Sequence, residues 1–328
     1  MARKWSYWTK NKLQILEDYV PAFNRASERS KERIYLDLMA GQPENEERFT
    51  GAKIAGSPRR VLSSQPGFTR HLFFELPRNA ERLQTVLTAD FPGKLFEVIA
   101  GDSNVEIDAA LASLSPFRWA PTFAFIDQQA AEVWWETLAK ISRFKGPQAK
   151  TKPELWLLMS PTMVAKGVSI RGTNSSEFRE RVTRLYGTRN WLNCQDAREG
   201  GTITADRYRD EMTNLMRFRL EKDLGYEFTQ RIPMKMENGT TIYDMIFASD
   251  HYVGEKIMSH LYKNAAEREP AMQREARRLA KIQREEKTGT EGLFPIPAES
   301  EPDVSGAILW QPQPCWNPTQ ATWWTDRD

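Results

Sequence analysis

The sequence predicts a doubly wound α/β domain with a mostly parallel sheet, an antiparallel hairpin near its carboxyl end and a helical insertion before that hairpin. Three observations carry this prediction. Short apolar runs alternate with segments of helical period, which is typical of strand-helix units. Asn238-Gly239 lies between two later apolar runs and is a strong hairpin signal. Four of the earlier runs end in or carry an acid, and these acids are Asp37, Glu75, Asp102 and Asp127. Because parallel strands end at one edge of a sheet, the four carboxylates are expected at the same edge, which would be the working face.

The first 32 residues are expected to form a helical brace on this domain. Within residues 5–26, large apolar side chains recur at helical spacing: Trp5, Trp8, Leu13, Leu16, Tyr19 and Phe23. Residues 42–56 are polar and acidic in their first half and contain glycine in their second, so they predict a long loop. Ser57-Pro58 then predicts the start of a helix, since proline is favoured at the first helical position.

Residues 33–160 are expected to form a Rossmann-like cofactor-binding core. Its first strand is the run 33–41, which carries Asp37 and breaks into a small-residue turn. Further strands are predicted at 69–75, 95–100, 122–127 and 154–159, and helices at 79–89, 105–115 and 130–143. This alternation favours parallel pairing through right-handed crossovers, because each strand must return to the same end of the sheet.

After Pro161 the alternation stops, and residues 161–225 predict a helical insertion, notably at 176–186 and 205–224. Residues 226–287 are expected to complete the core with strands at 226–236 and 241–248, followed by a helix rich in Arg, Lys and Glu. The tail, 288–328, is Pro-rich and contains Trp310, Trp316, Trp323 and Trp324 without a period. It is expected to be extended or disordered in isolation, with its tryptophans docking either on the domain or on a partner.

Composition narrows the classes of function. The 328 residues include 46 Lys and Arg against 44 Asp and Glu. The resulting net charge of +2 is too small to attract the protein as a whole to nucleic acid or to a membrane. No run approaches the roughly 18 apolar residues of a membrane span, and the first residues lack an apolar signal core. A cytoplasmic protein that does not enter the membrane is expected. The two cysteines are far apart and the chain has three histidines, which argues against a zinc site, an iron-sulfur cluster or a Cys-His nucleophile.

The acids at the strand ends suit a nucleoside cofactor of the S-adenosylmethionine type. Such a cofactor needs a tight turn near its amino acid moiety, an acid for the ribose hydroxyls and a polar group at the adenine edge. Asp37 with Ala40-Gly41 would supply the turn, Glu75 the ribose ligand, and Asp102 with Asn104 the adenine contact. Asp127, after the fourth strand, would face the transferable methyl group and orient or deprotonate the acceptor.

Each of these residues also has a structural interpretation. Asp102 could simply cap the helix that follows it, as Asp commonly does. Asp37 lies between two leucines, and burial without a purpose would be costly, which favours a function. Trp134 and Trp135 follow Asp127, but their spacing favours helix packing over a platform for a nucleobase.

The order of these motifs resembles the three-Cys-motif partner family. The resemblance spans residues 5–262, and it is carried by the combination of motifs rather than by any one of them: Trp5-Ser6, Leu13, Leu16, Tyr35-Leu36-Asp37, Ala40-Gly41, Gly56-Ser57-Pro58, Phe74-Glu75, Gly101-Asp102, Asn104, Phe125-Ile126-Asp127 and Phe247-Ala248-Ser249-Asp250. It implies a class I methyltransferase-like Rossmann domain that binds S-adenosylmethionine. It also implies a partner, a radical S-adenosylmethionine protein that carries the three cysteines.

This chain departs from the family pattern in two turns. The family has a second glycine two residues after Gly41, where this chain has Pro43, which cannot take the positive φ that brings such a turn close to a cofactor. The family has Asp-Pro-x-Gly where this chain has Asp127-Gln128-Gln129-Ala130, which removes a rigid proline turn. Two hypotheses therefore stand: an S-adenosylmethionine-dependent methyltransferase, and a catalytically inactive scaffold subunit for a radical enzyme or a defence complex.

The methyl acceptor could be nucleic acid. Residues 166–189 carry a local excess of basic side chains, which includes Lys166, Arg171, Arg179, Arg181 and Arg184. Such a patch can bind phosphates despite the small net charge, although a solvated helical face would look the same. On this patch alone, a nucleic-acid-binding module without chemistry is a third and weaker hypothesis.

Overall fold

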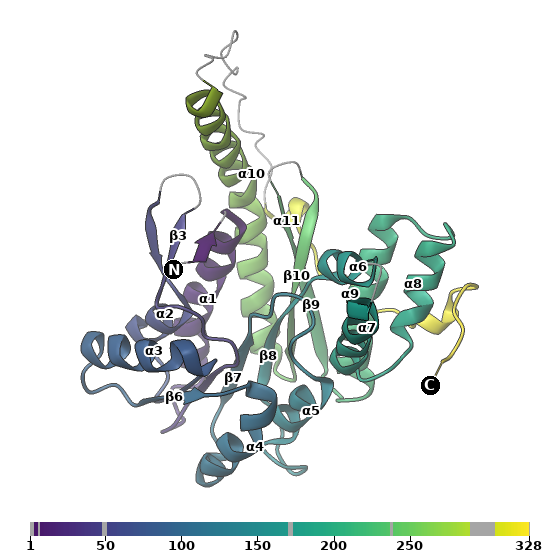
Figure 1. Ribbon diagram of the computed structural model, residues 1–328. Helices are drawn as coiled ribbons and strands as arrows, with labels where there is room; N and C mark the ends of the chain where they lie inside the picture. Colours follow the sequence, from purple (N-terminus) through teal and green to yellow (C-terminus); the bar gives the residue numbers. More distant parts are fainter. Residues whose placement is uncertain are drawn as a thin grey trace.

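The computed structural model describes residues 3–5, 7–47, 51–169, 173–236, 239–288 and 306–327. Its centre is a seven-stranded sheet in the order β6-β5-β2-β7-β8-β10-β9 (Figure 1). The strands are β2 (Ile34–Asp37), β5 (Arg70–Glu75), β6 (Phe96–Ala100), β7 (Thr122–Ile126), β8 (Glu154–Met159), β9 (Phe228–Lys235) and β10 (Thr241–Ser249). The first five of these pair in parallel, and β10 is antiparallel to both of its neighbours. The predicted Rossmann-like α/β sheet is confirmed, including its antiparallel hairpin, while Glu237 and Asn238 of the hairpin turn lie outside the described residues.

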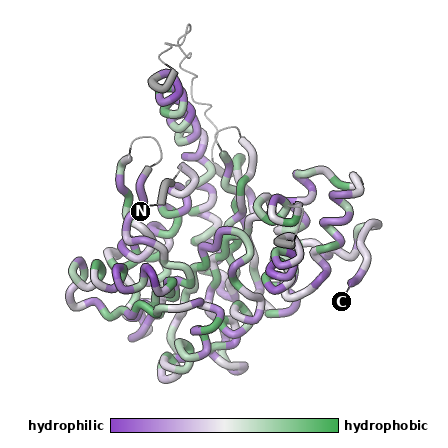
Figure 2. Tube along the Cα trace, in the orientation of Figure 1, coloured by the Kyte–Doolittle hydropathy of each residue, from purple (hydrophilic) through white to green (hydrophobic). Residues whose placement is uncertain are grey.

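The three central strands are buried along their whole length. Every residue of β2, β7 and β8 is buried, as expected for parallel strands covered by helices on both faces. Successive side chains point to opposite faces, so Leu36 joins the core on one side while Tyr35 joins the core on the other. Figure 2 shows hydrophobic residues concentrated along these strands.

Each face of the sheet is covered by its own set of helices. One face packs against α1 (Tyr7–Ala26), α2 (Ser57–Ser63), α3 (Pro77–Asp90) and α10 (Tyr252–Thr288). The other packs against α4 (Ser103–Ser113), α5 (Trp135–Arg143), α6 (Pro161–Ser169), α7 (Thr173–Tyr186), α8 (Trp191–Glu199) and α9 (Ala205–Lys222). In its described residues, the segment predicted as a helical insertion thus contains four helices, and it shares one continuous apolar core with α4 and α5.

The amino-terminal helix α1 lies against α10, far along the chain (Figure 1). Asn11 joins them, because its Nδ2 donates to the carbonyl of Ala265 at 3.3 Å and its Oδ1 accepts from Arg268 Nε at 2.6 Å. The predicted brace is therefore bound to the domain by polar contacts as well as by its apolar face.

The segment 42–56, predicted to be a loop, contains two short strands. β3 (Glu44–Glu47) and β4 (Lys53–Ala55) form an antiparallel pair, and β1 (Arg3–Trp5) adds to β3 in parallel to complete a small three-stranded sheet. The acidic sequence of β3 does not predict a strand, because it lacks the apolar residues that usually indicate one. Pairing with β1 and β4 holds this strand in place, rather than burial of an apolar face.

The tail 306–327 packs on its own domain. It contains α11 (Gly306–Leu309) and the short 3₁₀ helix η2 (Pro318–Gln320), and its other described residues form no further helix or strand. Trp310 Nε1 donates to the carbonyl of Arg231 at 2.8 Å, and Trp316 Nε1 donates to Glu211 Oε2 at 3.0 Å. Arg217, which is only 1% exposed, donates from Nη2 to the carbonyl of Gln313 at 2.6 Å. The tail therefore covers polar groups of α9 and β9.

Candidate functional site

A cavity of about 940 Å³ opens at the carboxyl edge of the parallel strands. Its wall is formed by residues that follow four strands: Ala40 and Gly41 after β2, Glu75 at the end of β5, Asp102 after β6 and Asp127 after β7. The strand order places β5 on one side of β2 and β7 on the other. The cavity therefore lies at the topological switch point, where the strand order reverses. Ligands of open α/β sheets bind at such a point.

Glu75 connects the turn after β2 to the start of α3. Its Oε2 accepts from the backbone N–H of Gly41 at 2.7 Å, and its Oε1 accepts from the backbone N–H of Leu76 and from Asn79 Nδ2, each at 3.0 Å. Gly41 has φ of +70°, a conformation that only glycine adopts without strain. Glu75 and the Gly41 turn are therefore held together on one wall of the cavity.

Asp37 is fully buried beneath this turn and does not line the cavity. Its Oδ2 accepts from Ser57 Oγ at 2.7 Å and from Tyr35 Oη at 3.1 Å, and its Oδ1 accepts from the backbone N–H of Met39 at 3.3 Å. Burial raises the pKa of Asp37 to about 7, and the nearby charge of Asp127 adds to this, while the hydrogen bonds from Ser57, Tyr35 and Met39 oppose it. The contacts of Asp37 make it a support for the turn.

Asp102 both caps a helix and lines the cavity. As the N-cap residue of α4, its Oδ1 accepts from the backbone N–H of Asn104 at 2.9 Å. The same oxygen also accepts from Asn104 Nδ2 at 2.8 Å. Asn104 is buried away from the cavity. It donates to the carbonyl of Glu132 and accepts from Trp134 N and Thr137 Oγ1, so it fixes the loop after β7.

Asp127 is held by a lysine that the sequence analysis did not single out. Lys12 of α1 places its Nζ 2.5 Å from Oδ1 and 2.6 Å from Oδ2 of Asp127, and this Nζ lies 5.6 Å from the centroid of the Tyr243 ring. The side chain of Lys12 is 6% exposed and that of Asp127 is 25% exposed. One signal was present in the sequence: Lys12 lies four residues from both Trp8 and Leu16, on the apolar stripe of α1, where a charge is unusual.

The turns after β2 and β7 are each held by their own contacts. Gln128 is buried; its Nε2 donates to the carbonyl of Leu158 at 3.0 Å, and its Oε1 accepts from the backbone N–H groups of Glu132 and Val133. Pro43 accepts from the N–H of Gly56 at 2.9 Å, and a Cβ on Gly56 would lie 2.4 Å from the carbonyl oxygen of Gln42. Hydrogen bonds and a close backbone approach thus shape both turns.

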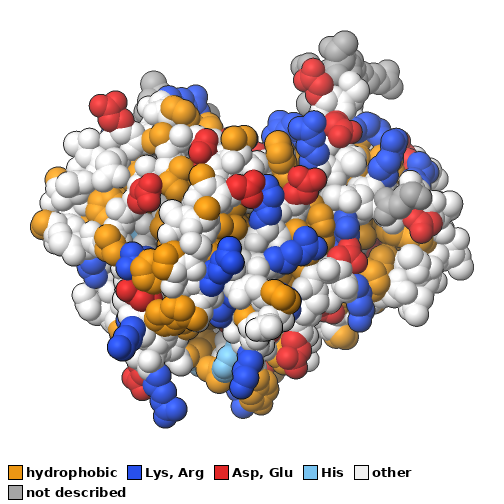
Figure 3. Space-filling view, turned by 90° about the horizontal axis from the view of Figure 1, so that it is seen from below, with side chains coloured by type: hydrophobic (Ala, Val, Ile, Leu, Met, Phe, Trp, Pro, Cys, Tyr) orange, Lys and Arg blue, Asp and Glu red, His pale blue; other side chains and the backbone are white. Residues whose placement is uncertain are grey.

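The described basic residues predicted as a patch in 166–189 lie around two hollows of the molecule. Arg181 lines the cavity and donates to the carbonyl of Ala131 at 3.3 Å. Arg184 forms an ion pair with Glu180 and lies over Trp134 of the same cavity. Arg179 forms an ion pair with Glu199, which lines a separate shallow depression together with Lys166. Arg171 lies outside the described residues. On the face seen in Figure 3, acidic and basic side chains are intermingled.

Trp134, interpreted from its spacing as a packing residue, lines the cavity and is half-buried. The guanidinium of Arg184 lies 5.4 Å from its ring centroid. Trp135 packs under Arg219, whose guanidinium is 4.2 Å from the ring. Of the two adjacent tryptophans, Trp134 is therefore the one that a bound molecule could touch.

Breaking the Lys12–Asp127 ion pair should destabilise the fold. We expect Lys12→Met to lower the free energy of unfolding by about 1–3 kcal/mol, because it leaves a largely buried carboxylate without its cation. Urea unfolding at pH 7.5 measures this, with Lys10→Met on the exposed side of the same helix as the matched control. A double-mutant cycle with Asp127→Asn should give a coupling energy of about 1–2 kcal/mol, and a coupling near zero would contradict the pairing.

Comparison of the chain with protein-family models and with curated proteins finds no match. In the described part of the chain, no group of His, Cys, Asp and Glu side chains could hold a metal ion. None of the helices described here combines the length and the apolar character that crossing a membrane requires.

Proposed function

We propose that this protein is an S-adenosylmethionine-dependent methyltransferase-like protein whose cofactor occupies the cavity at the carboxyl edge of the sheet. The observation that carries the proposal is the Glu75 carboxylate, which lies in the wall of a 940 Å³ cavity and is hydrogen-bonded to the positive-φ turn at Gly41. The mostly parallel sheet with its antiparallel terminal hairpin fits a class I methyltransferase-like domain.

The cofactor would extend along the strand ends. Its amino acid moiety would approach the backbone at Ala40 and Gly41, its ribose hydroxyls would donate to Glu75, and its adenine edge would meet Asp102. Methyl transfer from a sulfonium is a displacement on an activated carbon, so positioning of donor and acceptor supplies much of the rate. Asp127, fixed by Lys12, would orient the acceptor at the end of β7.

The acceptor we favour is nucleic acid, because Trp134 and Arg181 both line the cavity. An aromatic face stacks on a base regardless of its identity, and a guanidinium binds phosphate. The resemblance to the three-Cys-motif partner family adds a radical S-adenosylmethionine protein as the proposed partner, which would supply the cluster ligands.

Calorimetric titration with S-adenosylmethionine and S-adenosylhomocysteine tests the cofactor site. We expect micromolar binding to the wild type and binding about tenfold to a hundredfold weaker for Glu75→Ala, because two hydrogen bonds from the ribose hydroxyls to a carboxylate would be lost. Glu97→Ala, at an exposed position of the adjacent strand β6, is the matched control and should bind as the wild type does. Absence of binding to the wild type would refute the cofactor assignment.

A second function, an inactive scaffold subunit, is favoured by one specific observation. Both carboxylate oxygens of Asp127 are engaged by Lys12, so this side chain cannot accept a proton from an acceptor without breaking an ion pair. On this alternative the chain captures its partner, a radical enzyme or a defence-complex subunit, without methyl transfer. Cofactor binding with no transfer of radiolabelled methyl to total nucleic acid would favour the scaffold.

A further inference from the structure

A second cavity, of about 270 Å³, lies at the opposite end of the same strands; we call it the amino-edge pocket. Thr122 and Glu154, the first residues of β7 and β8, line it together with Ser249, the last residue of the antiparallel β10. The carboxyl-terminal half of α1 and the first turn of α10 form its sides. It is therefore separate from the cavity at the carboxyl edge and plays no part in the proposed function.

Glu154 is a buried carboxyl in this pocket, and no cation of the described residues lies within ion-pair distance of it. Among the described residues, its two oxygens accept hydrogen bonds from hydroxyl groups only: Tyr19 Oη donates to Oε2, and Ser249 Oγ donates to Oε1 at 2.7 Å. Burial raises the pKa of Glu154 to about 7, against the opposing effect of these hydrogen bonds and of Lys145. A buried carboxylate without a cationic partner is costly, and a ligand ammonium would remove that cost.

Lys145 is a half-buried cation in the same pocket that has no acidic partner. In the described part of the chain no carboxylate lies within ion-pair distance of its Nζ, which donates only to Thr151 Oγ1 at 3.3 Å. Burial lowers the pKa of Lys145, while the charges of Glu154 and Asp250 oppose this. The neighbouring Lys152 is different, because its Nζ pairs with Asp250 at 2.9 Å.

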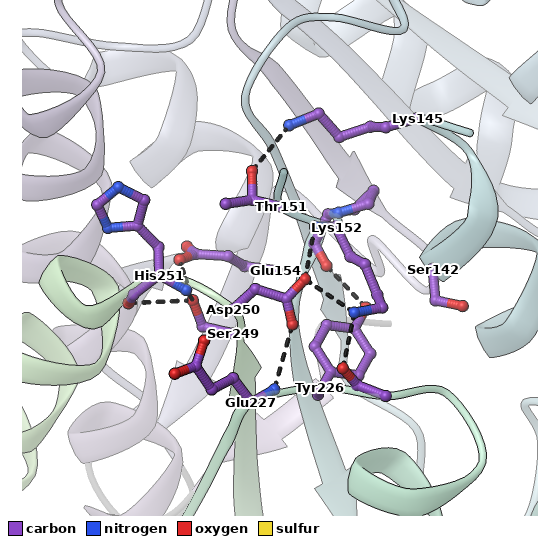
Figure 4. A network of polar contacts seen from close by, with 12 residues as sticks. Ser142, Lys145, Thr151, Lys152, Glu154, Tyr226, Glu227, Ser249, Asp250 and His251 are labelled. Atoms are coloured by element: carbon purple, nitrogen blue, oxygen red, sulfur yellow. Dashed lines mark hydrogen bonds and ion pairs between the residues drawn. The ribbon is translucent and has the colours of Figure 1, made fainter. Parts of the chain in front are cut away.

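His251 adds a neutral donor to the pocket. Its Nδ1 accepts from the backbone N–H of Val253 at 3.1 Å, so the proton of the neutral ring is on Nε2. In Figure 4 the Lys145 ammonium, the His251 ring and the Glu154 carboxyl come from three separate segments and surround one space. The pocket thus offers donors at one end and an acceptor at the other. The Lys145 ammonium and the Glu154 carboxylate do not form an ion pair with each other.

We propose that the amino-edge pocket binds a small apolar α-amino acid, whose ammonium pairs with Glu154 and whose carboxylate binds Lys145 and His251. A zwitterion satisfies both unpaired charges at once, which neither a simple cation nor a simple anion does. Phe23, Val253 and Ile257 line the pocket and provide apolar contact for a side chain. The volume of 270 Å³ is at the small end for ligand sites, which suits a single amino acid.

Three compounds with one carbon skeleton test this charge pattern. L-leucine carries both charges, 3-methylbutan-1-amine lacks the carboxylate, and 4-methylpentanoate lacks the ammonium. In titrations of the full chain at pH 8, followed by calorimetry and by thermal shift, leucine should bind at least tenfold tighter than either analogue. Glycine should bind more weakly than leucine, since it lacks the side chain that would contact Phe23 and Ile257.

Two variants place the binding at this pocket. Glu154→Gln keeps a hydrogen-bonding group for Tyr19 and Ser249, and Lys145→Met keeps an unbranched side chain that is one atom shorter, so both are expected to fold. Each should weaken leucine binding at least tenfold and leave the affinity for S-adenosylhomocysteine unchanged, while Glu75→Ala should do the reverse. The proposal is overturned if leucine does not bind at 10 mM, if either analogue binds as tightly as leucine, or if neither pocket variant weakens leucine binding.

Discussion

Removal of residues 306–328 should destabilise the domain by about 5 kcal/mol or more. Trp310 is 7% exposed, and the loss of one buried tryptophan side chain typically costs about 3–5 kcal/mol. The truncation also uncovers apolar surface on which Trp323 and Trp324 pack, and it takes the Gln313 carbonyl away from Arg217. An exposed apolar surface of this kind promotes association of the chain.

Thermal unfolding of the full and truncated chains measures the effect, with size-exclusion chromatography for association. Two neighbouring substitutions form a matched pair: Trp310→Ala should cost about 3 kcal/mol or more, while Gln311→Ala, at an exposed position, should cost less than about 0.5 kcal/mol. A truncated chain that unfolds at the temperature of the full chain would show that the tail contributes nothing to stability.

Asp37→Asn should stabilise the protein at pH 8 by about 3–4 kcal/mol and leave it nearly unchanged at pH 4. The folded-state pKa of Asp37 is about 7, above the value of 3.8 for an unperturbed Asp. Between these two values the folded state binds the proton and the unfolded state does not. The contribution of Asp37 to the free energy of unfolding is therefore fully present below about pH 4. It falls by about 1.4 kcal/mol per pH unit above that, and it is lost as the pH rises through about 7. Asn remains neutral and escapes this loss.

The measurement is urea unfolding of wild type and variant at intervals between pH 4 and pH 8. Burial also raises the pKa of Glu154 to about 7, so part of the decline should persist in Asp37→Asn and become smaller when Glu154→Gln is added. The remainder comes from Asp244 and Glu269, whose pKa values burial also raises. Asp108→Asn, at an exposed position of α4, is the control and should keep the wild-type slope. If Asp37→Asn has the wild-type slope as well, Asp37 is not the titrating group.

The strands were predictable because burial on both faces requires uninterrupted apolar residues. The run from Glu154 to Met159 matches β8 residue for residue, and the acids that follow the parallel strands reach one edge, as the topology requires. Glu75, Asp102 and Asp127 all line the cavity, so the sequence predicted three of the residues that form the candidate site.

The remaining features depend on contacts between distant parts of the chain. The sequence could not say that Asp127 meets Lys12, since 115 positions separate them and only the packing of α1 brings them together. It also could not distinguish Asp37 from its neighbours at the edge, because burial beneath the turn depends on the hydroxyls of Ser57 and Tyr35. The strand β3 is similarly defined by its pairing with β1 and β4.

The contact between α1 and α10 has a consequence for synthesis of the chain. The ribosome makes α1 first, yet Ala265 and Arg268, which bind Asn11, emerge about 250 residues later. At roughly 5–20 residues per second, the delay is about 12–50 s, during which the apolar stripe of α1 has no native cover on that side. A nascent chain that stalls before α10 therefore exposes an unprotected amphipathic helix, which is the kind of segment that chaperones bind.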